Sequence, residues 1–167
     1  MSCKKGFRIL LMVSVLVFIM GGMALSAPRV DEMDIRFPID VSGLTSEDLA
    51  ELEIIVNGTK VVADVDPVIR DGRLLIPLRA VFSTLGAEVH WFEDPRTVAI
   101  MDRDQDIRII VQLENYKGFG NRKHVQFEQD PILHGDRTMV LPELIVLGYA
   151  VDVEWDKEGL QLIIDTR

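Results

Sequence analysis

The sequence is poor in cysteine and in aromatic residues. Its only cysteine, Cys3, lies in the basic start of the chain, and aromatic residues make up 7% of the 167 residues. Without a second cysteine no disulfide can form within the chain, so the fold depends on the burial of apolar side chains. A lipoprotein anchor is also excluded, because its cysteine would follow an apolar run rather than precede it.

The residue combinations that carry out catalysis are missing as well. No serine stands in a recognisable arrangement with a histidine and a carboxylate, and no acidic pair stands out from a generally acidic chain. The segment 118–120 reads Gly-Phe-Gly, but it has neither the third glycine nor the following helix of a nucleotide-binding motif. We therefore expect no enzymatic activity and no cofactor.

The N-terminus has the layout of a secretory signal peptide. Three basic residues among the first eight precede an uncharged apolar run, 9–20, and Ala24 and Ser26 fit the small-x-small pattern of a cleavage site. We expect residues 1–26 to be a signal peptide that is cut after Ser26. The alternative is an uncleaved membrane anchor, because 9–27 is just long enough to cross a bilayer. Both predict an extracytoplasmic protein, secreted or associated with the cell envelope, and the lack of disulfides favours a bacterial one.

The remaining chain is strongly acidic. Removal of residues 1–26 takes away three basic and no acidic side chains, which leaves 15 basic and 27 acidic residues and a net charge of −12. Such a surface argues against nucleic acid or anionic lipid as a partner. Contact with a membrane is expected only through an uncleaved signal segment.

Residues 27–52 are predicted to form a linker or N-terminal arm. Two prolines and several acidic residues interrupt any regular pattern in its first part. Thr45, with Asp48 three residues later, is typical of a helix start and predicts a short helix that runs to Leu52.

From residue 53 the pattern indicates β-hairpins around a helix. Asn57-Gly58 lies between two β-branched runs, and Asp71-Gly72 lies between the runs 66–70 and 73–76, which are the strongest short signals for hairpins. A helix is predicted from Pro77 to Gly86, with one apolar stripe formed by Leu78, Val81, Phe82 and Leu85. Strands are expected at 87–91 and 97–101. A further pair, 107–113 and 124–127, is expected around a glycine-rich loop, 115–121.

Much of this unit recurs near the C-terminus. Asp130-Pro131 matches Asp66-Pro67, the segment 135–142 matches 71–77 with one residue inserted, Leu147-Gly148 matches Leu85-Gly86, and 153–155 matches 89–91. The second helix is predicted to be about one turn shorter. We therefore predict an α+β domain over 53–167, in which antiparallel sheets from β-hairpins pack on short helices in two pseudo-repeats, 53–101 and 107–165.

The pattern resembles one known family, the copper amine oxidase-like N-terminal domain, also called the stalk domain. The match rests on the spacing of the Asn-Gly hairpin, the Pro-Leu-Arg helix, the Leu-Gly-Ala stop and the tryptophan after it. The matching segments are 56–58, 67–69, 75–79, 85–89, residue 91 and 98–100, repeated more loosely over 131–164. The resemblance implies an antiparallel sheet wrapped on short helices, in a non-catalytic module that projects from or attaches to the envelope of Gram-positive bacteria.

The resemblance does not imply copper in this chain. In the oxidases the metal and the quinone cofactor belong to a different domain, whose copper site needs a His-x-His pair and a third histidine. Here His90, His124 and His134 are isolated, and the tyrosine of Asn115-Tyr116 is followed by Lys117 instead of an acidic residue. We assign no metal.

The candidate ligand-binding residues lie mainly in the glycine-rich segment. Two aromatic and three basic residues interrupt the acidic surface there, a combination suited to sugar rings or to an anionic wall polymer. These residues are Tyr116, Lys117, Phe119, Arg122 and Lys123. The alternative is a long hairpin loop in which Phe119 is docked.

Arg79 is the other candidate. It lies on the side of the predicted helix opposite the apolar stripe, where it is expected to brace a carbonyl or a carboxylate such as Glu88 or Asp94; the alternative is contact with a ligand anion. Trp91 and Trp155 occupy equivalent places beside a turn, where packing is the ordinary role.

The acidic run 102–106 begins like a calcium-binding loop. The glycine and glutamate that such a loop needs at its sixth and twelfth positions are replaced by Ile107 and Leu113. A solvated turn is the favoured interpretation, and weak calcium binding by Asp102, Asp104 and Asp106 stays open.

We expect a non-catalytic extracytoplasmic module for cell-envelope attachment, spacing or recognition, whose partner is a cell-wall polymer or glycan, or another envelope protein. The alternatives are an accessory domain or small subunit of a cell-wall hydrolase, and a secreted protein-binding or inhibitory module that uses an exposed sheet edge.

Overall fold

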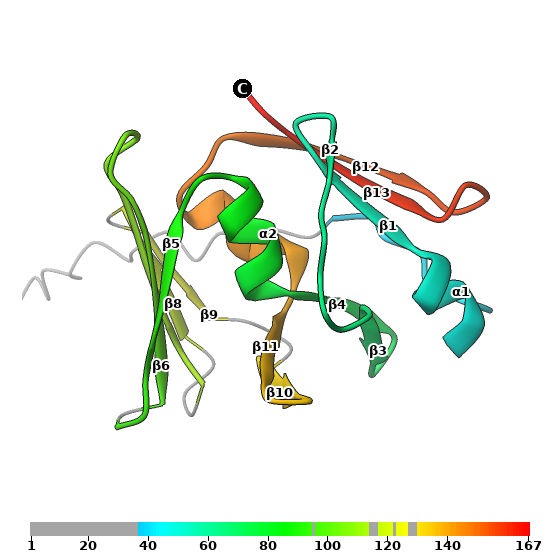
Figure 1. Cartoon of the computed structure of the whole chain (residues 1–167), viewed down its shortest axis with the longest axis horizontal. Coiled ribbons are helices and arrows are strands. Elements are labelled where there is room, and N and C mark those ends of the chain that lie inside the picture. The colour runs from blue at the N-terminus through cyan, green and yellow to red at the C-terminus, as the bar shows by residue number, and fades with distance from the viewer. Residues whose placement is uncertain (1–36, 95, 114–116, 122, 127–129) are drawn as a thin grey trace, which may run out of the picture.

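A computed structural model describes residues 37–94, 96–113, 117–121 and 130–167, together with the backbone of residues 123–126 (Figure 1). The predicted signal segment, 1–26, and the first part of the predicted arm lie outside the described residues. Of the helices in the described ranges, none combines the length and the apolar character that a membrane span requires.

The predicted α+β class is confirmed, because the chain forms mostly antiparallel sheets accompanied by short helices. The helices are α1 (Ser46–Glu51), α2 (Leu78–Thr84) and the 3-10 helix η1 (Pro142–Leu147). The strands are β1 (Glu53–Val56), β2 (Thr59–Lys60), β3 (Val68–Arg70), β4 (Arg73–Pro77), β5 (Glu88–Phe92), β6 (Thr97–Asp102), β7 (Ile107–Gln112), β8 (Lys117–Gly120), β9 (Lys123–Gln126), β10 (Ile132–His134), β11 (Arg137–Val140), β12 (Val151–Asp156) and β13 (Gln161–Thr166).

The local signals for turns and caps are confirmed. Asn57, Gly58, Asp71 and Gly72 have φ angles of 50°, 73°, 50° and 74°, as a hairpin turn with two left-handed centres requires. Thr45 caps α1 in a capping box, in which its hydroxyl accepts from the Asp48 N–H while the Asp48 carboxylate accepts from the Thr45 N–H. These elements follow from a few residues each.

The helix predicted between Pro77 and Gly86 is formed, as α2. The four residues of its apolar stripe are buried, and Gly86 closes it with a φ of 93°. Pro77 ends β4 and caps α2 at the same time. The chain therefore turns directly from a central strand into the helix that covers the core.

The two predicted copies meet in a central sheet with the order β10-β11-β4-β3. Each copy contributes one hairpin, and the two inner strands pair antiparallel, with Met139 opposite Pro77 and Val140 opposite Ile76. An antiparallel pair of equivalent strands is the arrangement that a two-fold relation between the copies produces.

The outer sheets exchange hairpins between the copies, which the sequence did not reveal. The hairpin β1-β2 of the first copy extends β12-β13 of the second in the order β12-β13-β1-β2, whereas β8-β9 of the second copy lies in the sheet β5-β6-β7-β8-β9 with β5-β6 of the first. β1 is parallel to β13, and β8 is parallel to β6 because the antiparallel strand β7 is inserted between them. Each outer sheet therefore needs strands from both copies.

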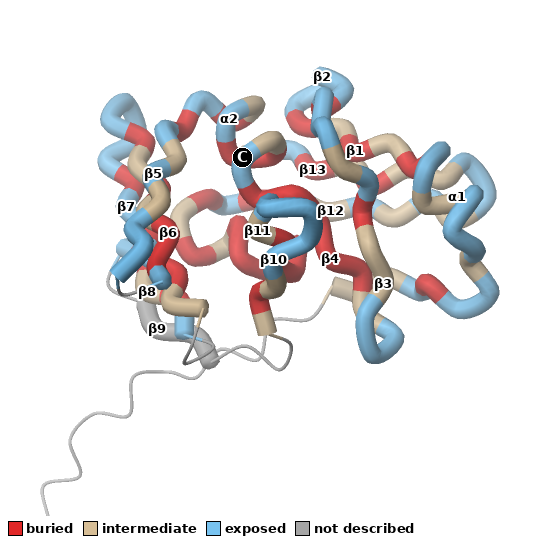
Figure 2. The backbone as a smooth tube through the Cα atoms, turned by 60° about the horizontal axis from the view of Figure 1, so that its bottom comes forward, coloured by how far each residue is buried: buried red, intermediate tan, exposed pale blue. Residues whose placement is uncertain are grey.

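The core lies between the three sheets and around α2 and η1 (Figure 2). Its largest fully buried side chains come from both copies and include Phe82, Leu75, Ile76, Met139, Leu144, Ile145 and Leu162. Burial of side chains of this size accounts for a stable fold without disulfides.

The predicted glycine-rich loop, 115–121, is wrong, because residues 117–120 form strand β8 between β7 and β9. The reason is close packing. A Cβ atom added to Gly120 would lie 2.6 Å from the carbonyl oxygen of Leu147, so the strand approaches η1 as closely as only glycine permits. Glycines that suggested a flexible loop serve here to bring two backbones together.

The second helix also differs from the prediction. It is six residues long against seven in α2, so it is shorter by one residue and not by a whole turn, but it is wound as a 3-10 helix. Gly148 ends it with a φ of −120°, so it does not adopt the left-handed conformation of Gly86. Gly148 is instead packed against Ile107 and Ile109 of β7. Both copies have a glycine at this position, but Gly86 is needed for its left-handed conformation and Gly148 for its close packing.

Candidate functional site

The structure does not gather the predicted ligand-binding residues at one site. Tyr116 and Arg122 lie outside the described residues, and only the backbone of Lys123 is described. Lys117 and Phe119 alternate along β8 with two buried glycines, so they lie on the outer face of the five-stranded sheet, where Phe119 is paired with Ile110. The predicted site becomes a strand surface.

Arg79 lies elsewhere, at the start of α2 on the inner side of that sheet. Its Nη1 donates to the carbonyl oxygen of Val89 at 2.8 Å, which ties the helix to the edge strand β5. The predicted bracing of a carbonyl is therefore present. The alternative, contact with a ligand anion, is compatible with this bond, because the guanidinium has further donors and the residue is exposed.

Arg79 borders a groove of about 1340 Å³ in the described surface. One wall is formed by α2 with β5 and β6, and the other by β2, the segment 62–64 and the β10-β11 hairpin. Trp91 of β5 and Val98 of β6 are among its lining residues. We call this hollow the Trp91 groove.

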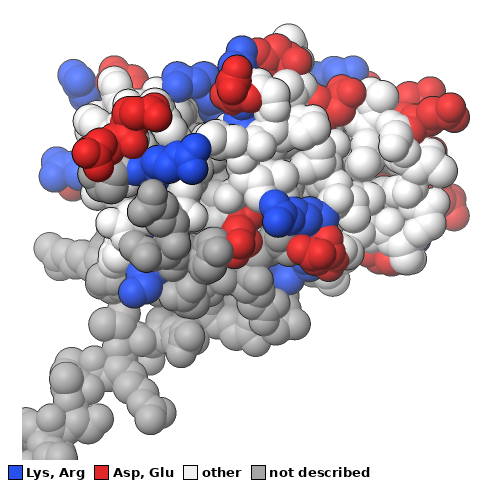
Figure 3. Space-filling model, turned by 90° about the horizontal axis from the view of Figure 1, so that it is seen from below, with Lys and Arg blue, Asp and Glu red and all other residues white. Residues whose placement is uncertain are grey.

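The Trp91 groove carries more basic than acidic side chains, although the whole chain has a net charge of −9. Its four basic residues are Lys60, Arg79, Arg96 and Arg137, and its three acidic residues are Asp64, Glu93 and Asp136. In the view from below, acidic side chains predominate at the end that carries α1, and basic ones are more frequent over the end with the five-stranded sheet (Figure 3). An anionic group would be attracted to the groove.

Two of these cations are paired with carboxylates. Arg137 forms an ion pair with Asp64 at 2.5 Å and lowers the pKa of that carboxyl, chiefly through the hydrogen bond. Lys60 does the same for Glu53 at 2.6 Å. Among the described residues, the side chain of Arg96 makes no hydrogen bond or ion pair, so it is available to a ligand without breaking a contact.

Trp91 presents its ring to the groove while its indole N–H is already occupied. The Nε1 donates to Oε2 of Glu93 at 2.9 Å. Because Glu93 is exposed, its carboxylate can turn away into water and release the N–H to a ligand at little cost. The place of Trp91 beside a turn predicts packing, the ordinary role of a tryptophan there, and gives no sign of this polar contact.

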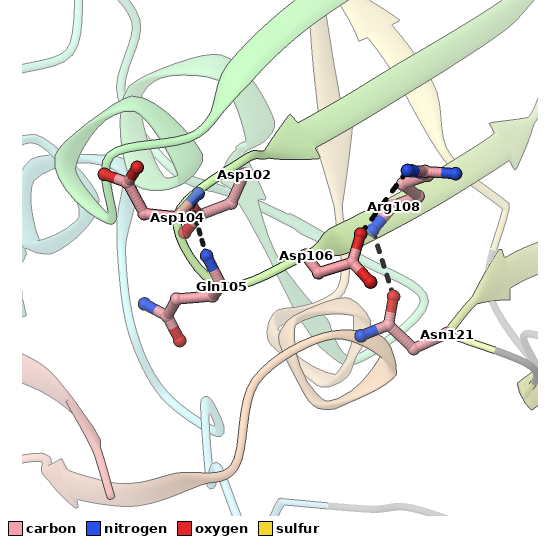
Figure 4. Close-up of polar contacts among 6 residues, drawn as sticks. All are labelled: Asp102, Asp104, Gln105, Asp106, Arg108 and Asn121. Carbon is pink, nitrogen blue, oxygen red and sulfur yellow. Dashed lines mark hydrogen bonds and ion pairs between the residues drawn. The ribbon is translucent and has the colours of Figure 1, made fainter.

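The acidic run 102–106 forms a turn, and its carboxylates do not converge (Figure 4). Asp102 is buried, and its Oδ1 accepts from the backbone N–H groups of Asp104 and Gln105 at 3.0 and 3.1 Å. The carboxylate of Asp104 points away, and that of Asp106 faces Arg108. In the described ranges, no group of three or more acidic, histidine or cysteine side chains is arranged to hold a metal ion.

Asp102 is instead part of a buried contact between the copies. Its Oδ2 accepts a hydrogen bond from the Tyr149 hydroxyl at 2.9 Å, 47 residues away in the sequence. Burial, and then the adjacent carboxylate, raise the pKa of Tyr149 well above its ordinary value of 10.0. Because the partner is distant, nothing in the acidic run itself indicates this role.

A comparison with protein families gives one match. Residues 55–164 match the family described as the copper amine oxidase N-terminal domain. Searches of curated proteins and of solved structures gave no significant match. The matched range covers about two thirds of the chain and spans β1 to β13, so it includes both copies and the Trp91 groove.

Proposed function

Because the chain belongs to the copper amine oxidase N-terminal domain family, which is a non-catalytic accessory domain, we propose that it is a binding module of the cell envelope. In this proposal the N-terminal segment directs the chain out of the cytoplasm, where the folded domain attaches to, spaces or recognises an envelope component. The basic and apolar N-terminal layout supports export.

The observation that carries the proposal is the Trp91 groove. A tryptophan ring and an exposed arginine, Arg96, whose side chain has no partner among the described residues, line one hollow of an otherwise acidic protein. A groove lined by an aromatic ring and by cations is suited to bind a ligand that is partly apolar and partly anionic, such as a segment of an envelope protein or an anionic wall polymer. No proton donor or nucleophile is needed for such a role.

Two other functions remain as alternatives. An accessory role beside a cell-wall hydrolase would use the same groove, but it would change the activity of the hydrolase instead of retaining the chain on the wall. A protein-binding or inhibitory role is favoured by the exposed edge strand β5, which is one side of the groove.

Retention on purified cell walls tests the proposal. The full chain should sediment with walls, and the Arg96→Ala variant should be retained less, because it removes a groove cation whose side chain has no partner among the described residues. Arg103→Ala is the matched control, since Arg103 is exposed and lies in the β6-β7 turn outside the groove. Equal release of both variants, or no retention of the parent chain on any envelope fraction, would contradict the proposal.

A second variant distinguishes the two basic surfaces. Lys117→Ala changes the outer face of β8, which carries two of the ligand-binding residues predicted in the glycine-rich segment, Lys117 and Phe119. If Lys117→Ala abolishes retention while Arg96→Ala does not, the binding surface is the strand face and not the groove.

A further inference from the structure

The chain already contains one extended segment bound beside a tryptophan. Residues 37–40 have no regular secondary structure and lie against the second copy, and Phe37 and Ile39 pack on the core. The indole Nε1 of Trp155 donates to the carbonyl oxygen of Asp40 at 3.0 Å, and Nζ of Lys157 donates to the Asp40 carboxylate at 2.7 Å. We call residues 37–42 the docked arm.

The far end of the docked arm is held at the start of η1. The N–H of Phe37 donates to Oε1 of Glu143 at 3.2 Å, and the same oxygen accepts from Nη2 of Arg73 at 2.5 Å. Glu143 is buried, although it is acidic. The docked arm therefore runs from the start of the second helix to the second tryptophan.

The repeat places an equivalent surface in the first copy. Trp91 and Trp155 both precede the last residue of their strand, and each is paired with a core residue, Val98 or Leu162. Arg137 opens β11 as Arg73 opens β4, each opposite the last residue of the preceding strand. The start of α2, at Leu78, corresponds to Glu143 at the start of η1.

The residues equivalent to those that hold the docked arm lie in the Trp91 groove. Leu78, Trp91, Glu93 and Arg137 all line it, and they correspond to Glu143, Trp155, Lys157 and Arg73, the residues that surround the docked arm. The groove is therefore the open equivalent of a surface that in the second copy is covered by an extended polypeptide.

The two surfaces differ in charge, and this indicates what the open one binds. Lys157, which holds Asp40, is replaced by Glu93, whereas two arginines of the groove, Arg79 and Arg96, take the places of Leu144 and Leu160. A carboxylate in the groove would thus be held at the α2 and β6 side. Apolar side chains would contact Leu133 and Val62, which are 42% and 88% exposed.

We propose that the Trp91 groove docks an extended segment of a partner polypeptide that carries apolar and acidic side chains, with its backbone beside Trp91 as the docked arm lies beside Trp155, and with a carboxylate toward Arg79 and Arg96. The inference rests on the proposed binding function and specifies its ligand. The partner is a different protein and not a second molecule of this chain, because in each molecule the docked arm is already held by Trp155, Lys157 and Glu143 of the same chain. On binding, the Trp91 N–H leaves Glu93 and donates to a carbonyl of the segment.

The two tryptophans of the chain make the test direct. A nitrogen–proton correlation spectrum of the full chain should contain two indole signals, which Trp91→Phe assigns. The probe is a capped synthetic peptide with the sequence of residues 37–44. Addition of this peptide should shift the Trp91 signal and leave the Trp155 signal in place, because the docked arm is tethered and outcompetes free peptide.

The charge of the ligand is tested with matched variants. Arg96→Glu should weaken the peptide roughly tenfold, as expected when an attractive contact becomes repulsive, and Arg103→Glu should leave its affinity unchanged. A peptide with asparagine in place of aspartate should bind more weakly, and a scrambled peptide of equal composition should bind least.

Three results would overturn the proposal. These are no shift of the Trp91 signal at millimolar peptide, a shift of Trp155 alone, and equal affinity for the scrambled peptide. If walls still retain the full chain in the same conditions, the binding function stands and only the peptide ligand is rejected. Addition of soluble wall glycan provides the comparison, since a Trp91 shift with glycan but not with peptide assigns the groove to carbohydrate.

Discussion

The two copies of the repeat have similar cores but different side chains on the surface beside their tryptophans. In the second copy, a buried glutamate, a lysine and a tryptophan hold residues 37–42 of the same chain, whereas in the first copy a leucine, a glutamate and a tryptophan line an open groove. The cores are alike and the surfaces are not. The difference indicates that one tryptophan site serves the fold and that its duplicate is free to serve recognition.

The exchange of hairpins explains how the surfaces of the two copies can differ while the domain stays stable. Because β1-β2 completes the sheet of the second copy and β8-β9 that of the first, both copies fold as one unit. A duplicated surface can then change its side chains while the other copy keeps the domain stable.

The largest difference between the copies is expected at their equivalent arginines. Arg73 is paired with buried Glu143, and Arg73→Ala should cost about 2–3 kcal/mol of the free energy of unfolding, because among the described residues the buried carboxylate would keep the Phe37 N–H as its one donor. Arg137→Ala removes an exposed pair with Asp64 and should change stability very little. Urea unfolding of both variants measures this, and equal losses would remove the distinction between the copies.

The exchanged strand β8 provides the second comparison. Gly120→Ala should destabilise by ~2 kcal/mol, because its methyl group would press on the Leu147 carbonyl and the strand would have to move away from η1. Phe119→Ala changes the outer face of the same strand and should cost clearly less. If the glycine variant unfolds at the parental urea concentration, the close approach is not needed.

The two tryptophans should respond differently to loss of the indole N–H. Trp155→Phe removes the bond to the Asp40 carbonyl and should cost about 1 kcal/mol, because the docked arm loses a partner. Trp91→Phe removes only a contact with exposed Glu93, so the thermal midpoint should stay close to the parental value. The reverse order would mean that the Trp91 side contributes more to the fold than the arm does.

The smallest expected effect is the pH dependence that Asp40 contributes. The hydrogen bond from Lys157 lowers the pKa of Asp40 well below its ordinary value of 3.8. A carboxyl whose pKa is depressed in the folded state stabilises the fold above its unfolded pKa, and the contribution is lost as the pH falls below about 4. Asp40→Asn should therefore make stability less sensitive to pH between 5 and 3. Urea unfolding of the parent and the Asp40→Asn variant at pH 5 and pH 3 measures this, and equal losses of stability would contradict it.

Much of the fold could be predicted because it depends on local signals. Asn57-Gly58, Asp71-Gly72 and the stripe from Leu78 to Leu85 each fix an element within a few residues. The repeat then gave the number of units. The hairpin exchange could not be predicted, because β1 and β13 are about a hundred residues apart and neither sequence indicates that the two strands pair.

The same limit explains the candidate site. The aromatic and basic residues of 116–123 are adjacent in the sequence, so they indicated a site, but residues 117–120 form strand β8, in which Gly118 and Gly120 are buried. The Trp91 groove combines residues from α2, β5, β6 and the β10-β11 hairpin. Its one sequence signal was the equivalence of Trp91 and Trp155, which becomes informative only when Asp40 is found on the second of them.

The most direct test of the central claim is a nuclear Overhauser measurement from the two indole N–H protons of the full chain. We predict contacts from Trp155 to protons of residues 39–41, and contacts from Trp91 to Glu93 but to no residue of 37–42. Contacts from Trp91 to the docked arm, or an arm that is seen by neither tryptophan, would contradict the division into one filled and one open site.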